Sequence, residues 1–286
     1  MVRALQRAVV GLAAAAAVLG TAGSTASPTL HGTLLESSFR SHALRGRLAF
    51  QIYLPPGYAG STTRYPVVYF LHGLPASPYA FRGMKTFAGA LDQVGRPAIF
   101  VAPQGAGDGD SDPEYLDWGT GRDWETAIGT ELPRYVDSHF RAIASRRGRA
   151  VVGISAGGYG AVLLALHHLG SYSVMESWSG YFHPTNPAGT APLDLGSTAA
   201  NRRVSAHSFV HSLRRAFGRR PTFFAFYVGR GDATFRAENE RLHRELAAAR
   251  VRHVFELYPG AHEQGLWQRH AVTWLGLALR HLAPAR

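Results

Sequence analysis

The chain has 286 residues, 46% hydrophobic and 17% charged, which predicts a globular protein with a sizeable core and excludes a disordered tail or a coiled coil. Cysteine is absent, which excludes disulfides, thiolate metal sites and a cysteine nucleophile. The formal charge of +11 comes almost wholly from arginine, and because no basic stretch is interleaved with aromatic residues, we expect no nucleic-acid partner.

Residues 1–26 have the pattern of a secretory signal peptide. Arg3 and Arg7 give a positive start, residues 8–19 form an apolar run, and a stretch of small residues offers a cleavage site. The apolar run is shorter than the ~20 residues that span a bilayer, which favours cleavage over the alternative, an uncleaved anchor. We expect a secreted or envelope-bound protein whose mature domain is residues 27–286.

The mature chain alternates strand patterns with helical patterns. Residues 29–39 and 48–54 alternate in hydrophobicity like half-exposed antiparallel strands. Apolar runs that predict buried strands follow at 66–71, 98–102, 150–154, 173–178, 222–228 and 253–258. Helical patterns lie at 80–94, 123–140, 156–169, 234–250 and 264–282. This order predicts a single α/β domain with a mostly parallel central sheet, helices on both faces and an antiparallel N-terminal edge.

One stretch, residues 182–220, matches no regular element except a short helix near 205–217. It is rich in Pro, Thr, Asn and Arg, and it predicts an insertion between two strands. Ligands of parallel sheets bind beyond the carboxyl ends of the strands, so residues that follow each strand are the candidate site residues. We expect the insertion to lie at the rim of that site.

A serine follows one of the buried strands in the segment Gly-Ile-Ser155-Ala-Gly. A serine hydroxyl is a weak nucleophile unless the backbone aims it outward and a base takes its proton. A tight strand-to-helix turn with flanking glycines provides that aim. Because the strand pattern ends at Ile154 and a helical pattern follows, we predict that Ser155 is a catalytic nucleophile rather than a structural turn residue.

The base and the acid are predicted from loops that follow later strands. His262 lies in a Pro-Gly-Ala-His loop after the last strand, and the chain order Ser, acid, His suits this architecture. Asp232 ends the preceding strand pattern and is the predicted acid that orients the imidazole. Glu238 and Glu240 in the next helix are the alternatives for that role.

Ester chemistry also needs two backbone N–H groups that bind the oxyanion of the tetrahedral intermediate. Ala156, which follows the nucleophile, is the predicted first donor. Leu74, in the turn after strand 67–71, is the predicted second donor, with His72 and Gly73 shaping the turn.

The sequence predicts neither a cofactor nor a metal. His207 and His211 have the i,i+4 spacing of a zinc pair, but the glutamate of H-E-x-x-H and a nearby third ligand are missing from the sequence. An acidic loop from Asp108 to Glu114 lacks the last glutamate of a calcium loop, so we interpret it as a solvated loop at the rim.

Several segments together match a family pattern. They are residues 67–74, 123–126 with 131–133, 153–158, 179–182, 231–232 and 259–262. These segments resemble the α/β-hydrolase esterases that include esterase D, the feruloyl esterases and the antigen 85 mycolyltransferases. The resemblance implies a triad of Ser155, Asp232 and His262, with Leu74 and Ala156 in the oxyanion hole. The mycolyltransferases usually carry S-M-A-G where this chain has S-A-G-G, and they take their acid from a later glutamate, so the esterase branch is favoured.

We therefore expect a secreted serine esterase that hydrolyses small-molecule, lipid or sugar acyl esters through an acyl-enzyme on Ser155. One alternative is an acyltransferase of mycolyltransferase type that moves an acyl group to a sugar such as trehalose. The alternative from another class is a non-catalytic envelope-binding or adhesion protein on the same fold. The positive charge predicts a weak, salt-screened association with an anionic cell envelope.

Overall fold

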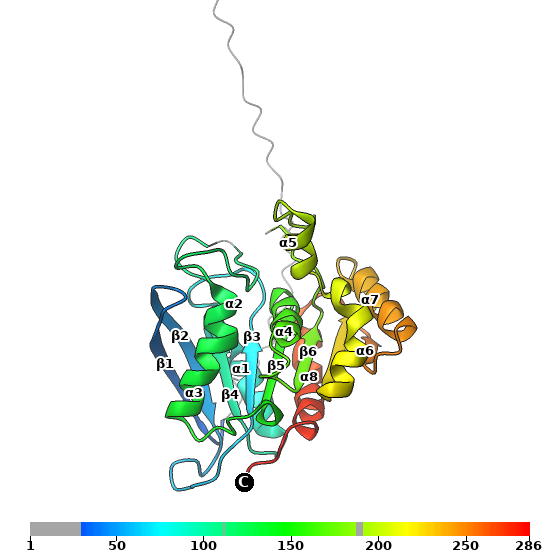
Figure 1. Cartoon of the computed structure of the whole chain (residues 1–286). Coiled ribbons are helices and arrows are strands. Elements are labelled where there is room, and N and C mark those ends of the chain that lie inside the picture. Colours follow the sequence, from blue (N-terminus) through cyan, green and yellow to red (C-terminus); the bar gives the residue numbers. More distant parts are fainter. Residues whose placement is uncertain (1–29, 111, 187–190) are drawn as a thin grey trace, which may run out of the picture.

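Eight strands form one sheet in the computed structural model, which describes residues 30–110, 112–186 and 191–286 (Figure 1). The strands are β1 (Thr33–Ser41), β2 (Gly46–Leu54), β3 (Val67–Leu71), β4 (Ile99–Pro103), β5 (Arg149–Ile154), β6 (Val174–Trp178), β7 (Phe223–Gly229) and β8 (Val254–Tyr258). Their order in the sheet is β1-β2-β4-β3-β5-β6-β7-β8. The predicted signal peptide, residues 1–26, lies outside the described residues.

The direction of the strands confirms the predicted fold class. β1 pairs antiparallel with β2, and β2 pairs antiparallel with β4. Every later pairing, from β4–β3 across to β7–β8, is parallel. The sheet is therefore mostly parallel, with its antiparallel part at the N-terminal edge, and the carboxyl ends of six strands meet along one edge.

Helices cover both faces of the sheet (Figure 1). On one face lie α3 (Leu132–His139), α4 (Ala156–His167), α6 (Val210–Arg219) and α7 (Arg236–Ala248). On the other face lie α1 (Lys85–Gln93) and α8 (Gln264–Arg280), which pack against each other. Among the described residues, we find no helix with both the length and the apolar character needed to cross a membrane.

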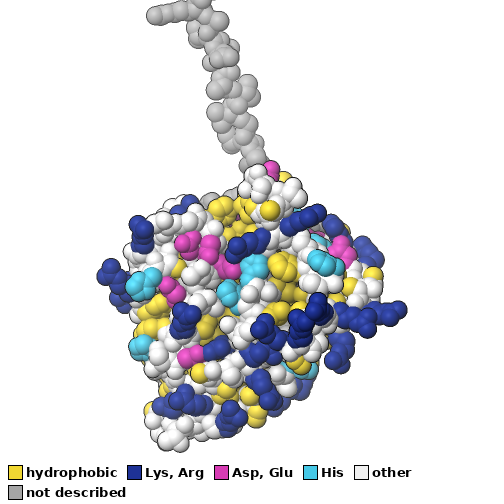
Figure 2. Space-filling model, viewed as in Figure 1, with side chains coloured by type: hydrophobic (Ala, Val, Ile, Leu, Met, Phe, Trp, Pro, Cys, Tyr) yellow, Lys and Arg dark blue, Asp and Glu magenta, His cyan; other side chains and the backbone are white. Residues whose placement is uncertain are grey.

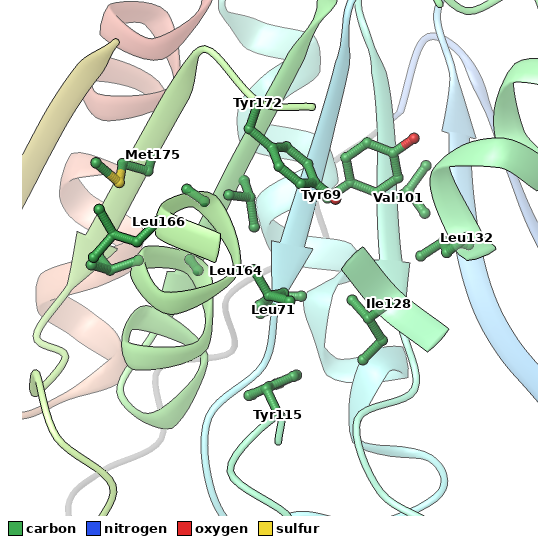
Figure 3. Packing of buried hydrophobic residues seen from close by; sticks show 14 of the residues in the cluster. Tyr69, Leu71, Val101, Tyr115, Ile128, Leu132, Leu164, Leu166, Tyr172 and Met175 are labelled. Carbon is green, nitrogen blue, oxygen red and sulfur yellow. The ribbon is translucent and has the colours of Figure 1, made fainter. Parts of the chain in front are cut away.

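Alternate residues of each central strand enter different apolar layers, because a parallel strand is buried on both faces. Tyr69, Leu71 and Val101 pack with Ile128 and Leu164 in the layer beneath α3 and α4 (Figure 3). The continuous apolar runs in the sequence follow directly from this two-sided burial.

The opposite layer is built largely from aromatic rings. Phe70 stacks on Phe87 of α1 with ring centroids 4.6 Å apart, and Trp178 meets Trp274 of α8 edge-on at 4.9 Å. Such pairs add ~0.5–1.5 kcal/mol each to the effect of area burial. They hold α1 and α8 firmly beneath the strands that carry the site.

The predicted helix 123–140 is one helical stretch with a wide turn in its middle. It runs through α2 (Trp124–Thr126), a π turn at Ala127–Glu131 and then α3. Pro133 has no N–H to offer the carbonyl of Gly129 four residues earlier, and the hydroxyl of Tyr172 donates to that carbonyl instead, at 3.4 Å. A Cβ at Gly129 would lie 2.9 Å from the side chain of Leu164, so glycine lets this helix pack closely on α4.

The same stretch ties α4 and the insertion together through Glu125. Its Oε1 lies 2.7 Å from Nδ1 of His167 and 3.3 Å from Nε2 of His168. Burial alone would raise the pKa of Glu125, but hydrogen bonds and charge from the two histidines lower it to about 2. The other ring nitrogen of His167 lies 2.9 Å from the carbonyl of Arg203, which is in the insertion.

The insertion contains more helix than the sequence predicts. The helix expected near 205–217 corresponds to a 3₁₀ turn, η4 (Ala206–Phe209), followed by α6. In addition, Ser197 caps a short helix, α5 (Thr198–Arg203), by accepting a hydrogen bond from the N–H of Ala200 at 3.1 Å. None of the six residues of α5 is buried, so no apolar periodicity marked it in the sequence.

One carboxyl group lies inside the sheet itself. Glu176 of β6 is fully buried and accepts a hydrogen bond from Nε1 of Trp178 at 3.1 Å. Burial raises the pKa of Glu176 from 4.5 to about 8. The folded chain therefore holds this proton more tightly than the unfolded chain, so its contribution to stability is complete below pH 4.5 and is lost as pH rises through about 8.

Glu176→Gln should remove this pH dependence while keeping the shape of the side chain. Relative to the wild type, the variant should gain unfolding free energy as pH rises from about 5 to about 8, by at most ~1.4 kcal/mol per pH unit. Urea unfolding of both proteins at several pH values measures the difference. Glu256→Gln, on the exposed face of β8, is the control and should show no such gain. If the unfolding free energy of Glu176→Gln changed with pH in the same way as that of the wild type, Glu176 would not be the source of the pH dependence.

Candidate active site

Ser155 occupies a strained turn between β5 and α4. Its φ is +52° and its ψ is −123°, a backbone conformation that a residue with a side chain rarely adopts. Its N–H donates to the carbonyl of Trp178 at 2.9 Å, which anchors the turn to β6. The hydroxyl thus stands at the carboxyl edge of the sheet, where ligands of such sheets bind.

Two glycines allow the backbone to close around this turn. A Cβ at Gly157 would lie 2.2 Å from the carbonyl oxygen of Leu71, at the end of β3. A Cβ at Gly73 would lie 2.9 Å from Cβ of Ser155. The loop after β3 and the start of α4 therefore meet at Ser155, and side chains at either glycine would separate them.

Gly157→Ala should lower the unfolding free energy by ~3 kcal/mol or more, because the new methyl group would overlap fixed backbone atoms. Gly218→Ala in α6 is the matched control, since nothing lies within 4 Å of its Cβ position. That variant should gain ~0.5–1 kcal/mol from higher helix propensity. Chemical denaturation of both variants measures the contrast. Equal stabilities would show that the turn is less tightly packed than described.

The structure brings Ser155, His262 and Asp232 together in one line of hydrogen bonds. Nε2 of His262 lies 3.0 Å from Oγ of Ser155, and Nδ1 lies 2.9 Å from Oδ2 of Asp232. Asp232 is buried, and its Oδ1 accepts from the N–H groups of Thr234 at 3.1 Å and Phe235 at 2.9 Å. The carboxylate is thereby fixed, while the histidine ring keeps some access to solvent.

Two aromatic side chains hold the ring of His262, and sequence reasoning missed both. Phe235 meets it edge-on with centroids 5.1 Å apart, and Trp267 does so at 5.2 Å. Trp267 is itself held by a hydrogen bond from its Nε1 to Oγ of buried Ser179, at 3.0 Å. Both rings lie within five residues of the predicted acid or base, which is the only sequence signal that could have marked them.

Neither alternative acid contacts His262. Glu238 accepts from the N–H of Phe182 at 2.8 Å and lies 2.6 Å from Nδ1 of His183. Glu240 forms an ion pair with Arg236 at 2.8 Å on the outer face of α7. Among the three predicted carboxylates, only Asp232 lies within hydrogen-bond distance of the imidazole.

The two predicted oxyanion donors belong to segments that pack together. Leu74 packs against an apolar cluster that contains Ala156, the first residue of α4. The turn before Leu74 is fixed by His72, whose Nδ1 lies 2.8 Å from the carbonyl of Gly73. The carbonyl of His72 accepts from the hydroxyl of Tyr115 at 2.6 Å, and burial lowers the pKa of the His72 ring. His72 thus has the shaping contacts expected of it.

The acidic loop is less solvated than the sequence predicts. Asp108 is exposed, as expected of a solvated loop, but Glu114 is buried, so that interpretation is wrong at the end of the loop. Glu114 accepts from the hydroxyl of Tyr181 and the N–H of Thr185, both at 2.7 Å. These contacts join the loop to the insertion, and burial with the nearby charge of Asp112 raises the pKa of Glu114 to about 8.

The insertion also contributes to an apolar wall beside Ser155. This wall comprises Leu116, Ala156, Tyr159, Leu163, Tyr181, Val204 and Phe235, with Leu74, Leu195 and Phe209 packed against it. Three of these residues, Leu195, Val204 and Phe209, come from the insertion. This cluster therefore packs the insertion against the start of α4, next to Ser155.

A hollow of about 1020 Å³ lies at the opposite end of the sheet, away from Ser155. Its basic lining residues are Arg146, Arg147, Arg214, Arg250, Arg252, His253 and His281. None of the described residues that line it is acidic, and the Ser–His–Asp line of hydrogen bonds is not part of it. Figure 2 shows basic side chains gathered around α6, next to this arginine-lined hollow. Its chemistry suits anions rather than ester hydrolysis.

The order of the strands, the helices on both faces and the sharp turn at the end of β5 make this protein an α/β hydrolase. The chain belongs to the Esterase family, whose family model matches residues 41–274. The resemblance deduced from the sequence motifs is thereby confirmed.

Curated relatives cover part of the chain. An esterase of Mycobacterium tuberculosis is 33% identical over 143 residues, which are 50% of this chain and 31% of that protein. A diacylglycerol acyltransferase/mycolyltransferase of Mycobacterium leprae is 35% identical over 72 residues, which are 25% of this chain and 21% of that protein. The chain thus spans about a third or less of the length of these two relatives.

Solved structures match the fold along most of the chain. An S-formylglutathione hydrolase from Agrobacterium tumefaciens superposes with a TM-score of 0.73 at 21% identity, over 89% of this chain and 97% of that one. A ferulic acid esterase superposes with a TM-score of 0.70 at 22% identity, over 89% of this chain and 100% of that one. At these identities the likeness concerns the fold.

Proposed function

We propose that this protein is a serine esterase that hydrolyses carboxylic acyl esters through an acyl-enzyme on Ser155. The observation that carries the proposal is the hydrogen-bonded line from Ser155 through His262 to buried Asp232. Membership of the Esterase family supports it independently. Distances of 2.9–3.0 Å are those expected between a nucleophile, its base and the group that orients the base.

In the proposed mechanism, Nε2 of His262 takes the proton of Ser155 as Oγ attacks the ester carbonyl. Asp232 holds the imidazole so that Nδ1 carries a proton and Nε2 is free to accept one, and it stabilises the imidazolium that forms. His262 then protonates the leaving alcohol. Water attacks the resulting acyl-enzyme with His262 again as the base, which releases the acid and restores Ser155.

The backbone N–H groups of Ala156 and Leu74 are the proposed oxyanion donors. The N–H of Ala156 belongs to the first turn of α4, where the helix dipole favours negative charge. The close approach of Gly73 to Ser155 supports the role of the neighbouring Leu74, because it carries the loop after β3 to the nucleophile. A donor of this kind contributes ~10²–10³-fold to kcat in serine hydrolases.

The related function to be distinguished is acyl transfer to a sugar such as trehalose. A transferase would use the same three side chains, with an acceptor alcohol in place of water. The short match to a mycolyltransferase favours this candidate over other transferases. The apolar wall and the insertion would decide between the two functions by excluding water or by holding an acceptor.

Kinetics with p-nitrophenyl esters from acetate to palmitate, with and without trehalose, test the proposal. We expect free acid as the product, with a chain-length preference set by the apolar wall. Acylated trehalose as the main product would instead establish the transferase. Absence of any turnover across the series would overturn the catalytic proposal and favour the non-catalytic envelope-binding or adhesion protein.

We also propose that the protein is exported and associates weakly with anionic polymers of the cell envelope. The signal pattern of residues 1–26 supports export, and the arginine-lined hollow offers the positive surface. Because salt screens such contacts, co-sedimentation with an anionic polymer should fall steeply as NaCl rises toward ~0.5 M.

Charge reversal locates this association. Arg214→Glu in the hollow should weaken binding at low salt more than the equal charge change Lys85→Glu, at an exposed position of α1. Co-sedimentation of the two variants gives the comparison. Equal losses would show that net charge alone, rather than the hollow, is responsible.

A further inference from the structure

We propose that His183, His207 and Glu238 form a Zn²⁺ site that fastens the insertion to α7. One potential ligand atom from each residue lies within 4.8 Å of the other two. The three residues come from separate segments, namely the loop after β6, the turn η4 and the first turn of α7. None of them takes part in the proposed hydrolysis.

The orientation of His207 is the strongest indication of a cation. Its Nδ1 lies 2.5 Å from Oε2 of Glu245, so Nδ1 carries the proton in the neutral ring and Nε2 presents a lone pair. Nε2 is buried, has no hydrogen-bond partner among the described residues, and lies 3.5 Å from Oε1 of Glu238. A lone pair that faces a carboxylate oxygen is repelled by it, and either a proton on Nε2 or a metal ion between the two atoms removes the repulsion.

The surroundings of His207 match those of zinc-binding histidines. Such a histidine usually donates its second ring N–H to a carboxylate, which fixes the ring and makes the free nitrogen more basic. Glu245 fills this role, and Nε of Arg241 in turn donates to Oε1 of Glu245 at 2.8 Å. The ligand is thus held by a second layer of residues on α7.

Glu238 and His183 complete the set. Nδ1 of His183 lies 2.6 Å from Oε1 of Glu238, and the N–H of Phe182 donates to the same oxygen at 2.8 Å. A tetrahedral zinc ion places its ligand atoms roughly 3.3 Å apart, so small movements of the side chains would admit it. The side chain of His183 is 31% exposed, which gives an ion a way in and leaves a fourth position for water.

The donor set selects zinc over the common hard cations. Two imidazole nitrogens and one carboxylate suit Zn²⁺, whereas Mg²⁺ and Ca²⁺ prefer oxygen ligands only. The sequence-based prediction of no metal weighed the pair His207 and His211 for zinc and the acidic loop Asp108–Glu114 for calcium. In the structure, His207 joins residues far from it in sequence, and His211 is not part of the group.

A metal here would act close to the proposed triad. The N–H of Arg236, the first residue of α7, donates to the carbonyl of Asp232 at 3.2 Å, and Phe235 packs on His262. Zinc would tie two parts of the insertion, at His183 and His207, to this same helix. The ion would therefore stabilise the rim without contacting the reacting atoms.

Zinc binding is measured directly on the full-length protein and on its Ser155→Ala variant. After dialysis against micromolar Zn²⁺, we expect one zinc per chain in both proteins, and a melting temperature raised by roughly 5 °C or more over the chelator-treated protein. X-ray absorption should show two imidazoles and no sulfur. Zinc binding does not depend on Ser155, so Ser155→Ala should bind zinc as the wild type does. A protein without esterase activity could therefore still bind zinc, and an active esterase could fail to bind it.

Variants locate the site. His183→Ala and His207→Ala should each lose the stoichiometric zinc, and Glu245→Gln should bind it ~10–100-fold more weakly. His211→Ala, one helical turn after His207, is the matched control and should keep it. His183 is partly exposed, so its variant carries the test if His207→Ala does not fold.

Two results would overturn the proposal. One is a wild type with no stoichiometric zinc, as expected if His207 is instead a cation held between Glu238 and Glu245. The other is full zinc retention in both His183→Ala and His207→Ala.

Discussion

Replacing Ser155 with alanine is expected to lower kcat/KM for ester hydrolysis by ~10³-fold or more, with little change in stability. Oγ of Ser155 attacks the carbonyl in the proposed mechanism, and it lies 3.0 Å from Nε2 of His262, which takes its proton. Alanine keeps the Cβ of the serine, so the turn between β5 and α4 should persist. Steady-state kinetics together with thermal unfolding of the variant measure both effects.

Ser173→Ala is the matched control for this substitution. Ser173 is also a buried serine next to the sheet, but it lies at the amino end of β6, beside the arginine-lined hollow. Its loss should leave kcat/KM within about twofold of the wild type. Retention of activity in Ser155→Ala would contradict the acyl-enzyme mechanism, whatever the control shows.

Replacing Asp232 with asparagine is expected to lower kcat by ~10⁴-fold. The oxygen of asparagine can still accept from the N–H groups of Thr234 and Phe235, which would leave its NH₂ group facing Nδ1 of His262. That group donates, so the ring would accept at Nδ1 and carry its proton on Nε2. A histidine in this tautomer cannot take the proton of Ser155.

Glu240→Gln is the matched control for the acid, since it makes the same chemical change on the outer face of α7. It should leave kcat unchanged and cost at most ~0.5 kcal/mol of stability from its i,i+4 ion pair. Kinetics of both variants across pH give the comparison. If Asp232→Asn kept near wild-type turnover, another carboxylate would have to orient the imidazole.

The parts of the fold that the sequence predicted are those whose signal is local. The apolar run predicted at residues 66–71 corresponds to β3 (Val67–Leu71), which starts one residue later and is buried on both faces. Ser155 was identified in the same way, since strand, glycine-flanked turn and helix follow each other directly along the chain. Asp232 and His262 were predicted as the acid and the base because each lies in a loop that directly follows a predicted strand.

The parts that the sequence did not predict depend on contacts between distant segments. Glu114 lies in an acidic loop, and only the packing of Tyr181 and Thr185 over it makes it a buried group. His207 was paired by spacing with His211, whereas folding places it beside His183 and Glu238. No pattern in a single sequence links such residues, because their distance along the chain carries no periodicity.

The most direct test of the central claim is to label the protein with an organophosphonate that reacts with activated serines and to locate the label by peptide mass spectrometry. We expect one label per chain, carried by Ser155, and none on the Ser155→Ala variant. Asp232→Asn should label much more slowly, because its imidazole cannot accept the serine proton. An unlabelled wild type, or a label on another residue, would contradict the assignment of Ser155 as the nucleophile.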